Sequence, residues 1–392
     1  MKIAIVGAGA VGAALTRVLC NNPSVAAVSV IDKNGTVLEP LKQSIQSKKL
    51  RTFRLGVEKE QALATIIKSF DFLISALPSE YNLQLCRLAI ENGINYIDFG
   101  GDDAIYEEQL AYNNHALEQE VLAIPNCGMA PGLVNIIAMS AYEEFDSVES
   151  IHIRATGLPV NPIPPLNYQL SFSPAGLINE YLNDVHIIHN GKTTKVKAME
   201  GYEPLTFYSE PDFSDLEAFY TSGHITTLAK ELDGKVKELD FKTIRYKGHR
   251  DIMKALFELG FDSDGIIDIR SNLTFKELLI RQLNKKLPRG YEDIVLAKTV
   301  VSGVIDGVQR VRDYEIVHRY HQTYDLPAMM ACTTIPVEIV TELVHEGKVT
   351  RSGGVCAPEF AVDKTEFMKR LSEKGIEISV NEQTLNETAD AR

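Results

Sequence analysis

With 392 residues, of which 45% are hydrophobic and 24% charged, the chain is long enough for two domains and has a composition typical of globular proteins. The formal net charge of −13 and the lack of a basic cluster argue against nucleic acid and anionic membranes as partners. No apolar run reaches the roughly 20 residues of a membrane span, and the start, MKIAIVGAGA, lacks the features of a signal peptide.

The cysteines and histidines predict neither a disulfide framework nor a metal site. The cysteines are few and widely spaced, and they form no CxxC motif, so a reducing, cytoplasmic compartment is favoured. His186 and His189 form an HxxH pair in a strand-like stretch, where positions three apart point to opposite faces. We therefore expect no bound metal.

The first element in chain order is a short apolar strand, residues 3–6, followed by glycines in the spacing GxGxxG and then by a helix-forming run. The first glycine permits a tight strand-to-helix turn, the second lets the backbone approach a pyrophosphate, and the third lets the helix pack on the strand. The diphosphate would then meet N–H groups at the helix N-terminus. The predicted contacts are Gly7, Gly9, Ala10, Val11 and Gly12.

A second apolar strand, residues 26–31, ends at Asp32, twenty residues past Gly12. A carboxylate there can bind the ribose hydroxyls of NAD and would repel the 2′-phosphate of NADP. Lys33 is adjacent and could soften this preference. The sequence predicts NAD and leaves NADP open.

The alternation of strands and helices continues to residue 125. Strands are expected at 51–57, 71–78, 94–100 and 121–125, and helices at 58–70, 81–92 and 103–120. Apolar strands with intervening helices predict an α/β fold, a doubly wound parallel (Rossmann) sheet over residues 1–130, with ligands at its carboxyl edge. Further cofactor contacts expected at this edge are Ala76, Leu77, Pro78, Gly100 and Pro131.

The stretch PNCGMAPGLVN, residues 125–135, marks the exit from this domain. Pro125 would end the sixth strand. Pro131 would be the first helical residue, where its missing N–H costs little, and the helix would continue over 132–145. Cys127 has no base paired with it by spacing, so we interpret it as a packed thiol.

The pattern changes in the second half. Alternation around residues 151–155 is followed by a proline-rich stretch, 157–182, which predicts a long ordered loop. Strand-like runs at 293–304 and 314–320 and a helix at 335–347 follow, and the tail NETADAR has the composition of a disordered segment. An α+β domain over residues 131–325 is expected to carry the substrate site and a dimer surface, so the chain would form a homodimer or higher homo-oligomer.

Several motifs in order resemble the saccharopine dehydrogenase family: GAGAVG, GMAPGLVN, GLPVNPIPPLNYQLSFSPAGLINEY, EAFYTSGHITTL, FKTIRYKGH and TTIPVEIVTELVHEGKVTRSGGVCAPE. The resemblance covers nearly the whole chain. It implies a Rossmann domain, an inserted α+β domain, and a C-terminal segment, 326–392, that packs back on the first domain. It also implies hydride transfer between a nicotinamide and a C–N bond of a lysine-derived amino acid.

Two positions bear on the substrate within this family. Members that handle saccharopine by the glutamate-forming route often show Asp before the Pro-Gly and Cys before the following GLP-type motif, whereas this chain has Ala130 and Thr156. Both differences resemble members that oxidise the 6-amino group of L-lysine with NAD, giving 2-aminoadipate 6-semialdehyde (which cyclises to a piperideine carboxylate), NADH and ammonia. A saccharopine or polyamine-type C–N dehydrogenase, or a non-catalytic NAD-binding sensor, stays open as an alternative.

Amine oxidation needs a neutral amine, a carboxylate anchor and an acid/base group. Arg245 matches the family position expected to hold a substrate carboxylate, as suits bidentate binding by arginine. Tyr168, Thr221 and Ser222 are further expected substrate contacts. The candidates for acid/base work are Asp98, Asp103 and His224, with His249 as a further possible proton shuttle.

Overall fold

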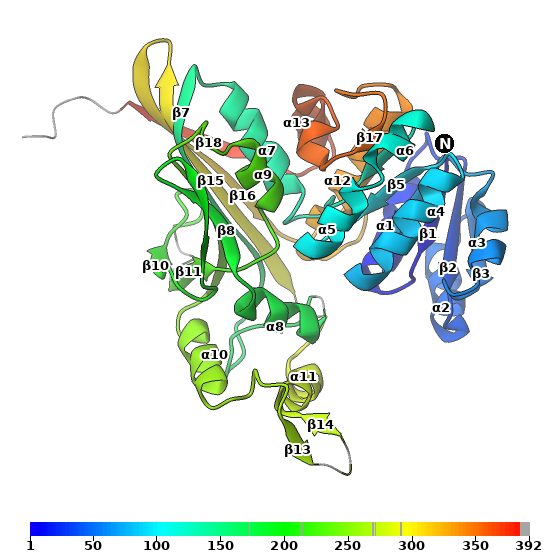
Figure 1. Ribbon diagram of the computed structural model, residues 1–392, viewed down its shortest axis with the longest axis horizontal. Coiled ribbons are helices and arrows are strands. Elements are labelled where there is room, and N and C mark those ends of the chain that lie inside the picture. Colours follow the sequence, from blue (N-terminus) through cyan, green and yellow to red (C-terminus); the bar gives the residue numbers. More distant parts are fainter. Residues whose placement is uncertain are drawn as a thin grey trace, which may run out of the picture. The chain divides into compact units, whose positions relative to one another are not determined.

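The computed structural model describes residues 1–171, 173–211, 213, 215–268, 270, 272–290 and 292–384 (Figure 1). The predicted disordered tail lies outside these residues. The chain divides into two compact units. Unit 1 comprises residues 1–140, 321–326 and 330–376, and unit 2 comprises residues 141–320, 327–329 and the stretch from Glu377 onward. Each unit is described by itself below.

Unit 1 contains a seven-stranded parallel sheet with the strand order β17-β6-β5-β4-β1-β2-β3. This doubly wound order confirms the predicted Rossmann sheet. The seventh strand, β17, has two residues and comes from the C-terminal part of the chain, which is why no run of apolar residues revealed it. The strands are β1 (Lys2–Val6), β2 (Ala27–Asp32), β3 (Leu50–Arg54), β4 (Phe72–Ser75), β5 (Asn95–Asp98), β6 (Leu122–Ile124) and β17 (Gly354–Val355).

The helices of unit 1 differ from the prediction at several places: α2 and α13 were not predicted, α12 begins at Ala328 instead of residue 335, and one predicted helix is divided. Helix α2 (Gly35–Ile45) was missed because its first residue is a glycine and Pro40 lies inside it, both unfavourable in helices. Asn34 compensates by accepting a hydrogen bond from Thr36 N at 3.0 Å. The helix expected over 103–120 is two helices, α5 and α6. The other helical segments are α1 (Ala10–Asn21), α3 (Glu60–Ile67), η1 (Ser79–Tyr81), α4 (Asn82–Glu91), α5 (Asp103–Leu110), α6 (Asn113–Glu118), α7 (Leu133–Glu143), α12 (Ala328–His345), η2 (Pro358–Phe360) and α13 (Lys364–Glu373).

Unit 2 is built on a nine-stranded mixed sheet, as the α+β prediction required. Its main path is β10-β11-β12-β7-β15-β16-β18, with β8 and β9 attached beside β12, and β13 and β14 form a separate hairpin. The strands are β7 (Ser147–Pro159), β8 (Val185–His189), β9 (Lys192–Val196), β10 (Glu203–Leu205), β11 (Leu216–Tyr220), β12 (Glu238–Tyr246), β13 (Ile266–Asp268), β14 (Leu273–Thr274), β15 (Asp293–Ile305), β16 (Val308–His318) and β18 (Ser379–Thr384).

The proline-rich stretch 157–182 is only partly the predicted loop. It ends in helix α8 (Pro174–Leu182), whose N-cap Ser173 accepts a hydrogen bond from Gly176 N at 3.0 Å. Pro174 is the first helical residue, where proline is tolerated, so the proline density concealed a helix start. The remaining helices of unit 2 are α9 (Thr226–Glu231), α10 (His249–Glu258) and α11 (Phe275–Lys286).

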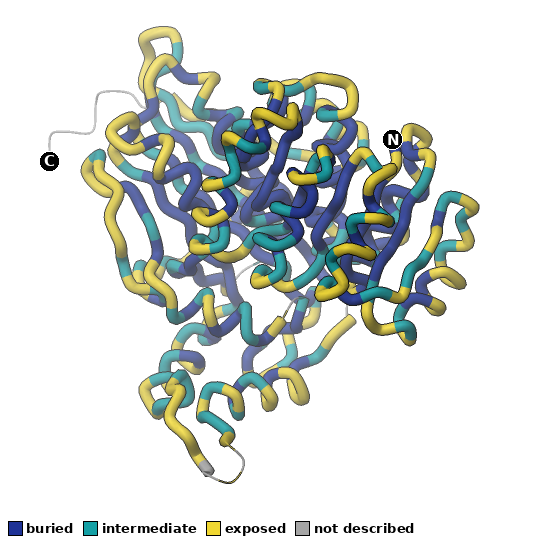
Figure 2. Tube along the Cα trace, turned by 45° about the vertical axis from the view of Figure 1, so that its right-hand side comes forward, coloured by how far each residue is buried: buried dark blue, intermediate teal, exposed yellow. Residues whose placement is uncertain are grey.

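Each unit has its own apolar core. Figure 2 shows the central strands of both sheets as buried and their connecting loops as largely exposed. In unit 1 the core includes Leu73, Leu85 and Tyr96, and in unit 2 it includes Leu158, Phe219 and Ile294. The packed parallel sheet of unit 1 makes its carboxyl edge a fixed frame for the side chains that follow its strands.

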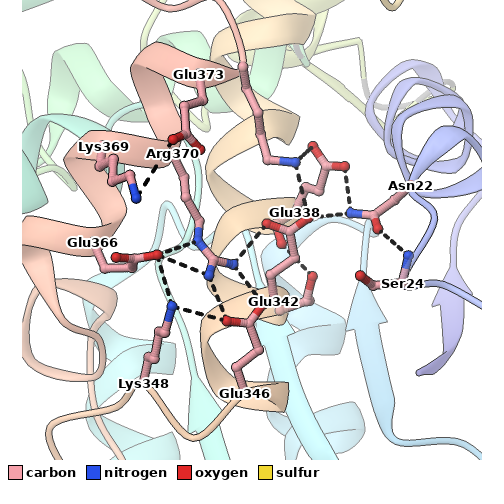
Figure 3. A network of polar contacts seen from close by, with 12 residues as sticks. Asn22, Ser24, Glu338, Glu342, Glu346, Lys348, Glu366, Lys369, Arg370 and Glu373 are labelled. Carbon is pink, nitrogen blue, oxygen red and sulfur yellow. Dashed lines mark hydrogen bonds and ion pairs between the residues drawn. The ribbon is translucent and has the colours of Figure 1, made fainter.

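A polar network fastens the C-terminal helices to the rest of unit 1 (Figure 3). Asn22, just after α1, donates to Glu338 at 2.8 Å and to Glu342 at 2.5 Å, both on α12. The side chain of Glu338 is 0% exposed, and Lys374 after α13 pairs with it at 3.1 Å. Arg370 pairs with Glu346 at 2.6 Å. Burial raises the pKa of Glu338, and the ammonium of Lys374 opposes that shift.

Replacing Lys374 with Ala should lower the free energy of unfolding by about 3 kcal/mol, because a buried carboxylate loses its cation. Lys369→Ala, on α13, is the matched control. Lys369 and Glu373 are both mostly exposed and 3.8 Å apart, so less than about 1 kcal/mol should be lost. Urea denaturation of both variants measures the difference, and equal losses would contradict this account.

Candidate functional site

The turn between β1 and α1 has the geometry that the glycine motif predicts. Gly7 has φ +108°, and a Cβ on it would lie 2.5 Å from the carbonyl oxygen of Ala76. A Cβ on Gly12 would lie 2.0 Å from the carbonyl oxygen of Gly7, whereas a Cβ on Gly9 would meet nothing within 4 Å. Gly7 and Gly12 are therefore required for packing, and Gly9 opens the space into which a diphosphate could come.

The N-terminus of α1 borders that open space. Gly9 is its N-cap, and within unit 1 no side chain caps the helix. Its first N–H groups, beginning with Ala10 and Val11, are thus available to an anion. The expected residues Ala76, Leu77 and Pro78 follow β4 directly, and Ala76 N donates to the carbonyl oxygen of Val6 at 2.8 Å. These residues fit a dinucleotide.

The end of β2 carries groups that suit either nicotinamide cofactor. Asp32 accepts from Ala8 N at 2.8 Å and from Asn34 N at 2.7 Å, so its carboxylate is held at the sheet edge. Arg54 is paired with Asp32 in the β2–β3 register, and its side chain is exposed beside Lys33. A carboxylate favours the ribose hydroxyls of NAD, and a nearby arginine can accept a 2′-phosphate.

Asp98 is a structural carboxylate and not the base that we expected. It is 0% exposed. One oxygen accepts from Gly100 N at 2.8 Å and Asn126 N at 3.0 Å, and the other accepts from the side chain of Gln109 at 2.7 Å. Burial raises its pKa, and these donors oppose that shift. The carboxylate thereby holds the ends of β5 and β6 together and has no surface to offer a ligand.

Asp103 lies in the first turn of α5, next to the N-cap Asp102, where a carboxylate stabilises the positive end of the helix. It stays a candidate. Gly100 has φ +68° and lies against Asn126, because a Cβ there would be 1.9 Å from the Asn126 side-chain oxygen. The close packing against Asn126 therefore requires a glycine at position 100, in addition to the predicted contact with the cofactor.

The exit stretch ends in a tight loop. Gly128 N donates to the carbonyl oxygen of Pro131 at 2.9 Å, and Gly132 adopts φ +126°. Helix α7 begins at Leu133, so the prediction that Pro131 is the first helical residue was wrong: this hydrogen bond and the positive φ of Gly132 keep the loop non-helical for two more residues. Cys127 is buried, and burial raises the pKa of its thiol, as suits a packed side chain.

Unit 2 buries a guanidinium without a carboxylate partner. Arg245, on β12, is 3% exposed. Its Nη1 contacts the hydroxyl oxygens of Thr156 at 2.9 Å and Thr243 at 2.5 Å, and the carbonyl oxygen of Ile244 at 2.8 Å. Nη2 makes no hydrogen bond to any described residue, and no described carboxylate lies within 4.0 Å. A buried cation with an unused donor is suited to an anionic ligand.

A chain of hydrogen bonds fixes the orientation of this guanidinium. Arg245 Nε donates to Tyr181 Oη at 2.9 Å. Because the carbonyl oxygen of Leu166, 2.9 Å from His249 Nδ1, can only accept, Nδ1 carries the proton and Nε2 accepts from the Tyr181 hydroxyl at 3.0 Å. Burial, and then the charge of Arg245, lower the pKa of His249 to about 3. His249 is thus a neutral structural histidine and not a proton shuttle.

Of the other predicted substrate residues, Tyr168 lies in this cluster. The ring of this buried tyrosine is 4.8 Å from the guanidinium carbon of Arg245, so its face shields the cation. Thr221 and Ser222 follow β11 and are also buried, and Ser222 N donates to the backbone carbonyl of Glu180 at 3.1 Å. The Thr221 hydroxyl has no hydrogen-bond partner among the described residues.

Sequence reasoning missed Glu180, on α8. Its side chain is 22% exposed, and its Oε1 lies 4.0 Å from Nε2 of the predicted catalytic residue His224. Burial raises the pKa of Glu180 to about 7, although the charge of Arg245 opposes that shift. The ring of His224 packs on Phe241 at 4.2 Å. No motif marked Glu180, because its setting depends on a helix concealed by prolines.

The described residues contain no group of three or more His, Cys, Asp or Glu side chains arranged to hold a metal ion. The two histidines of the HxxH pair have separate partners: His189 pairs with Glu238 at 3.0 Å, and His186 lies 3.4 Å from the Thr226 hydroxyl. No helix in the described part of the chain is both long and apolar enough to cross a membrane.

A Rossmann unit with an open glycine turn is typical of the class of proteins that bind a dinucleotide, and the second unit buries an arginine that suits an anion. Two family models match the chain: Saccharopine dehydrogenase NADP binding domain over residues 3–124, and Saccharopine dehydrogenase C-terminal domain over residues 128–376. The chain belongs to the saccharopine dehydrogenase family, a family of NAD(P)-dependent oxidoreductases. The resemblance and the fold class predicted from the sequence are confirmed.

Similar proteins share this fold at low identity. Mitochondrial alpha-aminoadipic semialdehyde synthase of Mus musculus is 23% identical over 71% of this chain and 31% of its own length. Saccharopine dehydrogenase (NADP+, L-glutamate-forming) of Schizosaccharomyces pombe is 22% identical over 54% of this chain and 48% of its own. The chain thus matches between about a third and a half of these relatives' length.

Two solved structures extend the comparison. Saccharopine dehydrogenase (L-Glu forming) from Saccharomyces cerevisiae has a TM-score of 0.77 at 19% identity and covers 98% of this chain and 100% of its own. Homospermidine synthase from Legionella pneumophila in complex with NAD has a TM-score of 0.69 at 15% identity, covering 100% and 93%. At these identities the likeness shows the fold alone.

The glycine turn yields a paired prediction. Gly9→Ala should change the free energy of unfolding by less than about 0.5 kcal/mol, since open space receives the methyl group, yet weaken NADH binding at least about tenfold. Gly12→Ala should lower stability by more than about 2 kcal/mol, because its Cβ collides with backbone. Thermal unfolding and fluorescence titration with NADH measure the two effects. Unchanged NADH affinity in Gly9→Ala would remove this turn from the cofactor site.

The raised pKa of Glu180 makes stability depend on pH. The unfolded carboxyl, with a pKa of about 4.3, loses its proton before the folded one, so the folded state loses stability as pH rises from about 4.3 to about 7. Glu180→Gln removes this titration. The variant should match the wild type at pH 4 and be more stable at pH 8 by up to about 4 kcal/mol, measured by denaturant unfolding. A difference that does not vary with pH would contradict the assignment.

Proposed function

We propose that the chain is an NAD-dependent L-lysine 6-dehydrogenase, which converts lysine, NAD and water to 2-aminoadipate 6-semialdehyde, ammonia and NADH. The observation that carries the proposal is the buried guanidinium of Arg245, whose neutral partners leave its charge and Nη2 for a substrate carboxylate. An amino acid supplies that carboxylate and an amine carbon. When bound, NAD supplies the hydride acceptor.

The residues of this chain would do three things in the reaction. Gly9 and the start of α1 would hold the diphosphate, and Asp32 the ribose. Arg245 would bind the carboxylate and so limit where the amine carbon can lie. Such a limit matters because hydride transfer needs the amine carbon about 3–3.5 Å from the acceptor carbon. A base must take a proton from the ammonium, whose pKa in free lysine is about 10.4.

Lysine is favoured over saccharopine because unit 2 offers one buried arginine without a carboxylate partner among its described residues. Saccharopine carries three carboxylates and lysine one. The other strongly buried arginine of unit 2 among the described residues, Arg154, is already paired with Asp240 at 2.8 Å and with Glu203. Thr156, at the position where glutamate-forming members often have Cys, holds Arg245 through its hydroxyl at 2.9 Å. These features support a substrate with a single anchored carboxylate.

A panel of substrates tests the proposal. Lysine, ornithine, saccharopine and diamines are each incubated with NAD or NADP, and reduced nicotinamide is followed by its absorbance. Lysine should be oxidised fastest, with one ammonia released per NADH. If lysine is not turned over but saccharopine, or an aldehyde plus an amine, is, the result would instead support the alternative of a saccharopine or polyamine-type C–N dehydrogenase. No turnover of any substrate would favour the sensor.

Arg245→Ala should raise the Michaelis constant for lysine at least about 100-fold, since a buried charge-assisted contact is lost, while the dissociation constant of NADH stays within about twofold. Tyr181→Phe removes the hydroxyl that accepts from Arg245 Nε and should raise the Michaelis constant for lysine about tenfold. Arg281→Ala, an exposed arginine on α11, is the control. Steady-state kinetics give all three values, and an unchanged constant for Arg245→Ala would place the carboxylate elsewhere.

We also propose, from the sequence, that the protein works in the cytoplasm as a homodimer or higher homo-oligomer. Light scattering on the purified protein measures the mass of the assembly. A mass near 43.5 kDa would mean a monomer and contradict this part of the proposal.

A further inference from the structure

Glu180 occupies a place in unit 2 that no motif or family name assigned to it. It lies on α8 next to Tyr181, whose hydroxyl accepts from Arg245 Nε. Its backbone carbonyl accepts from Ser222 N at 3.1 Å, which ties α8 to the end of β11, and its carboxylate lies 4.0 Å from Nε2 of His224. Glu180 is therefore held within the same cluster as the anchor for the carboxylate.

The side chain of Glu180 is more accessible than the two histidines of this cluster that were predicted as acid/base candidates, His224 (9% exposed) and His249 (1% exposed). His249 is neutral and has both ring nitrogens engaged. Glu180 keeps 22% of its side-chain surface open, although most of it is withdrawn from water. Of these three groups, Glu180 has the most exposed side chain, and its carboxylate can accept a proton.

We propose that Glu180 is the general base of the amine oxidation, an assignment that rests on the proposed function. Its ionised carboxylate takes one proton from the 6-ammonium of lysine. The C6–H bond then breaks, its electron pair passes to NAD, and the nitrogen lone pair forms the C=N bond of the iminium ion. The proton on Glu180 leaves to water and accounts for the one proton released overall, and water then attacks the iminium carbon, so that the aldehyde forms and the nitrogen leaves as ammonium.

The surroundings of Glu180 suit that task at neutral pH. The groups that act on it are Arg245 on β12, Tyr168 before α8, Tyr181 beside it and His224 after β11. Burial raises its pKa to about 7, with Arg245 opposing. A base with a pKa near the working pH is ionised often enough to act and basic enough to accept the proton. Activity should therefore rise with pH through about 7.

The first test separates two ways in which a carboxylate could serve lysine. L-norleucine keeps the α-amino and carboxylate groups but lacks the 6-amine, whereas 6-aminohexanoate keeps the carboxylate and the 6-amine but lacks the α-amine. Binding of both to the full-length protein is measured by calorimetry in the presence of NADH, for wild type and Glu180→Gln. We expect 6-aminohexanoate to bind at least fivefold more weakly to the variant and norleucine to change by less than twofold.

Every other outcome overturns the assignment. If norleucine weakens and 6-aminohexanoate does not, Glu180 holds the α-ammonium and is an anchor. If both change equally, or neither changes, or the wild type binds neither analogue, Glu180 does not face the reacting amine.

The second test uses turnover. Glu180→Gln should lower kcat at least 100-fold and abolish the low-pH limb near pH 7 in the profile of kcat/KM, and Glu180→Asp should retain the limb. Glu258→Gln, an exposed glutamate on α10, is the matched control and should behave as wild type. A kcat within fivefold of wild type in Glu180→Gln would sink the proposal.

These experiments distinguish a wrong substrate from a wrong general base. If wild type does not oxidise lysine, the proposed function falls. The pH profile is then recorded with whichever substrate of the panel turns over, and the limb near pH 7 and its loss in Glu180→Gln still decide the role of Glu180.

Discussion

The charge of Arg245 is the constraint on which the arrangement of unit 2 depends. A guanidinium that is 3% exposed would ordinarily need an acid partner, because an unpaired buried charge is costly. This one is held by the hydroxyls of Tyr181, Thr156 and Thr243, which accept from Nε and Nη1 without cancelling the charge and leave Nη2 unused by any described residue. The charge of Arg245 therefore stays available to attract an anion.

The two units meet different chemical needs. In unit 1 the glycine turn presents backbone N–H groups, and side chains are excluded where Gly7 and Gly12 pack against neighbouring backbone. Asp98 contributes by bracing the sheet edge from inside. In unit 2 the buried guanidinium of Arg245 supplies a full positive charge, which suits an anionic ligand.

The sequence predictions were correct where the pattern lies within a short stretch of the chain, and they failed where the structure depends on contacts between distant segments. The apolar runs of β1, β2, β4 and β5 marked the parallel sheet correctly, because strands buried on both faces have a continuous apolar pattern. Helix α2 was missed because of Gly35 and Pro40, and α8 because of the prolines before it. Missing α8 also concealed Glu180, whose significance comes from contacts with the distant segment around Ser222 and His224.

The amino-acid sequence alone determined the Rossmann fold, the glycine turn, the family and the position of Arg245, because these depend on periodicity, backbone freedom and motif order within short stretches. Only the tertiary structure decided that Asp98 is a buried brace, that His249 is neutral, and that Glu180 is a partly open carboxylate beside a histidine. The protonation and the partners of these groups are set by burial and by charges brought together from distant parts of the chain.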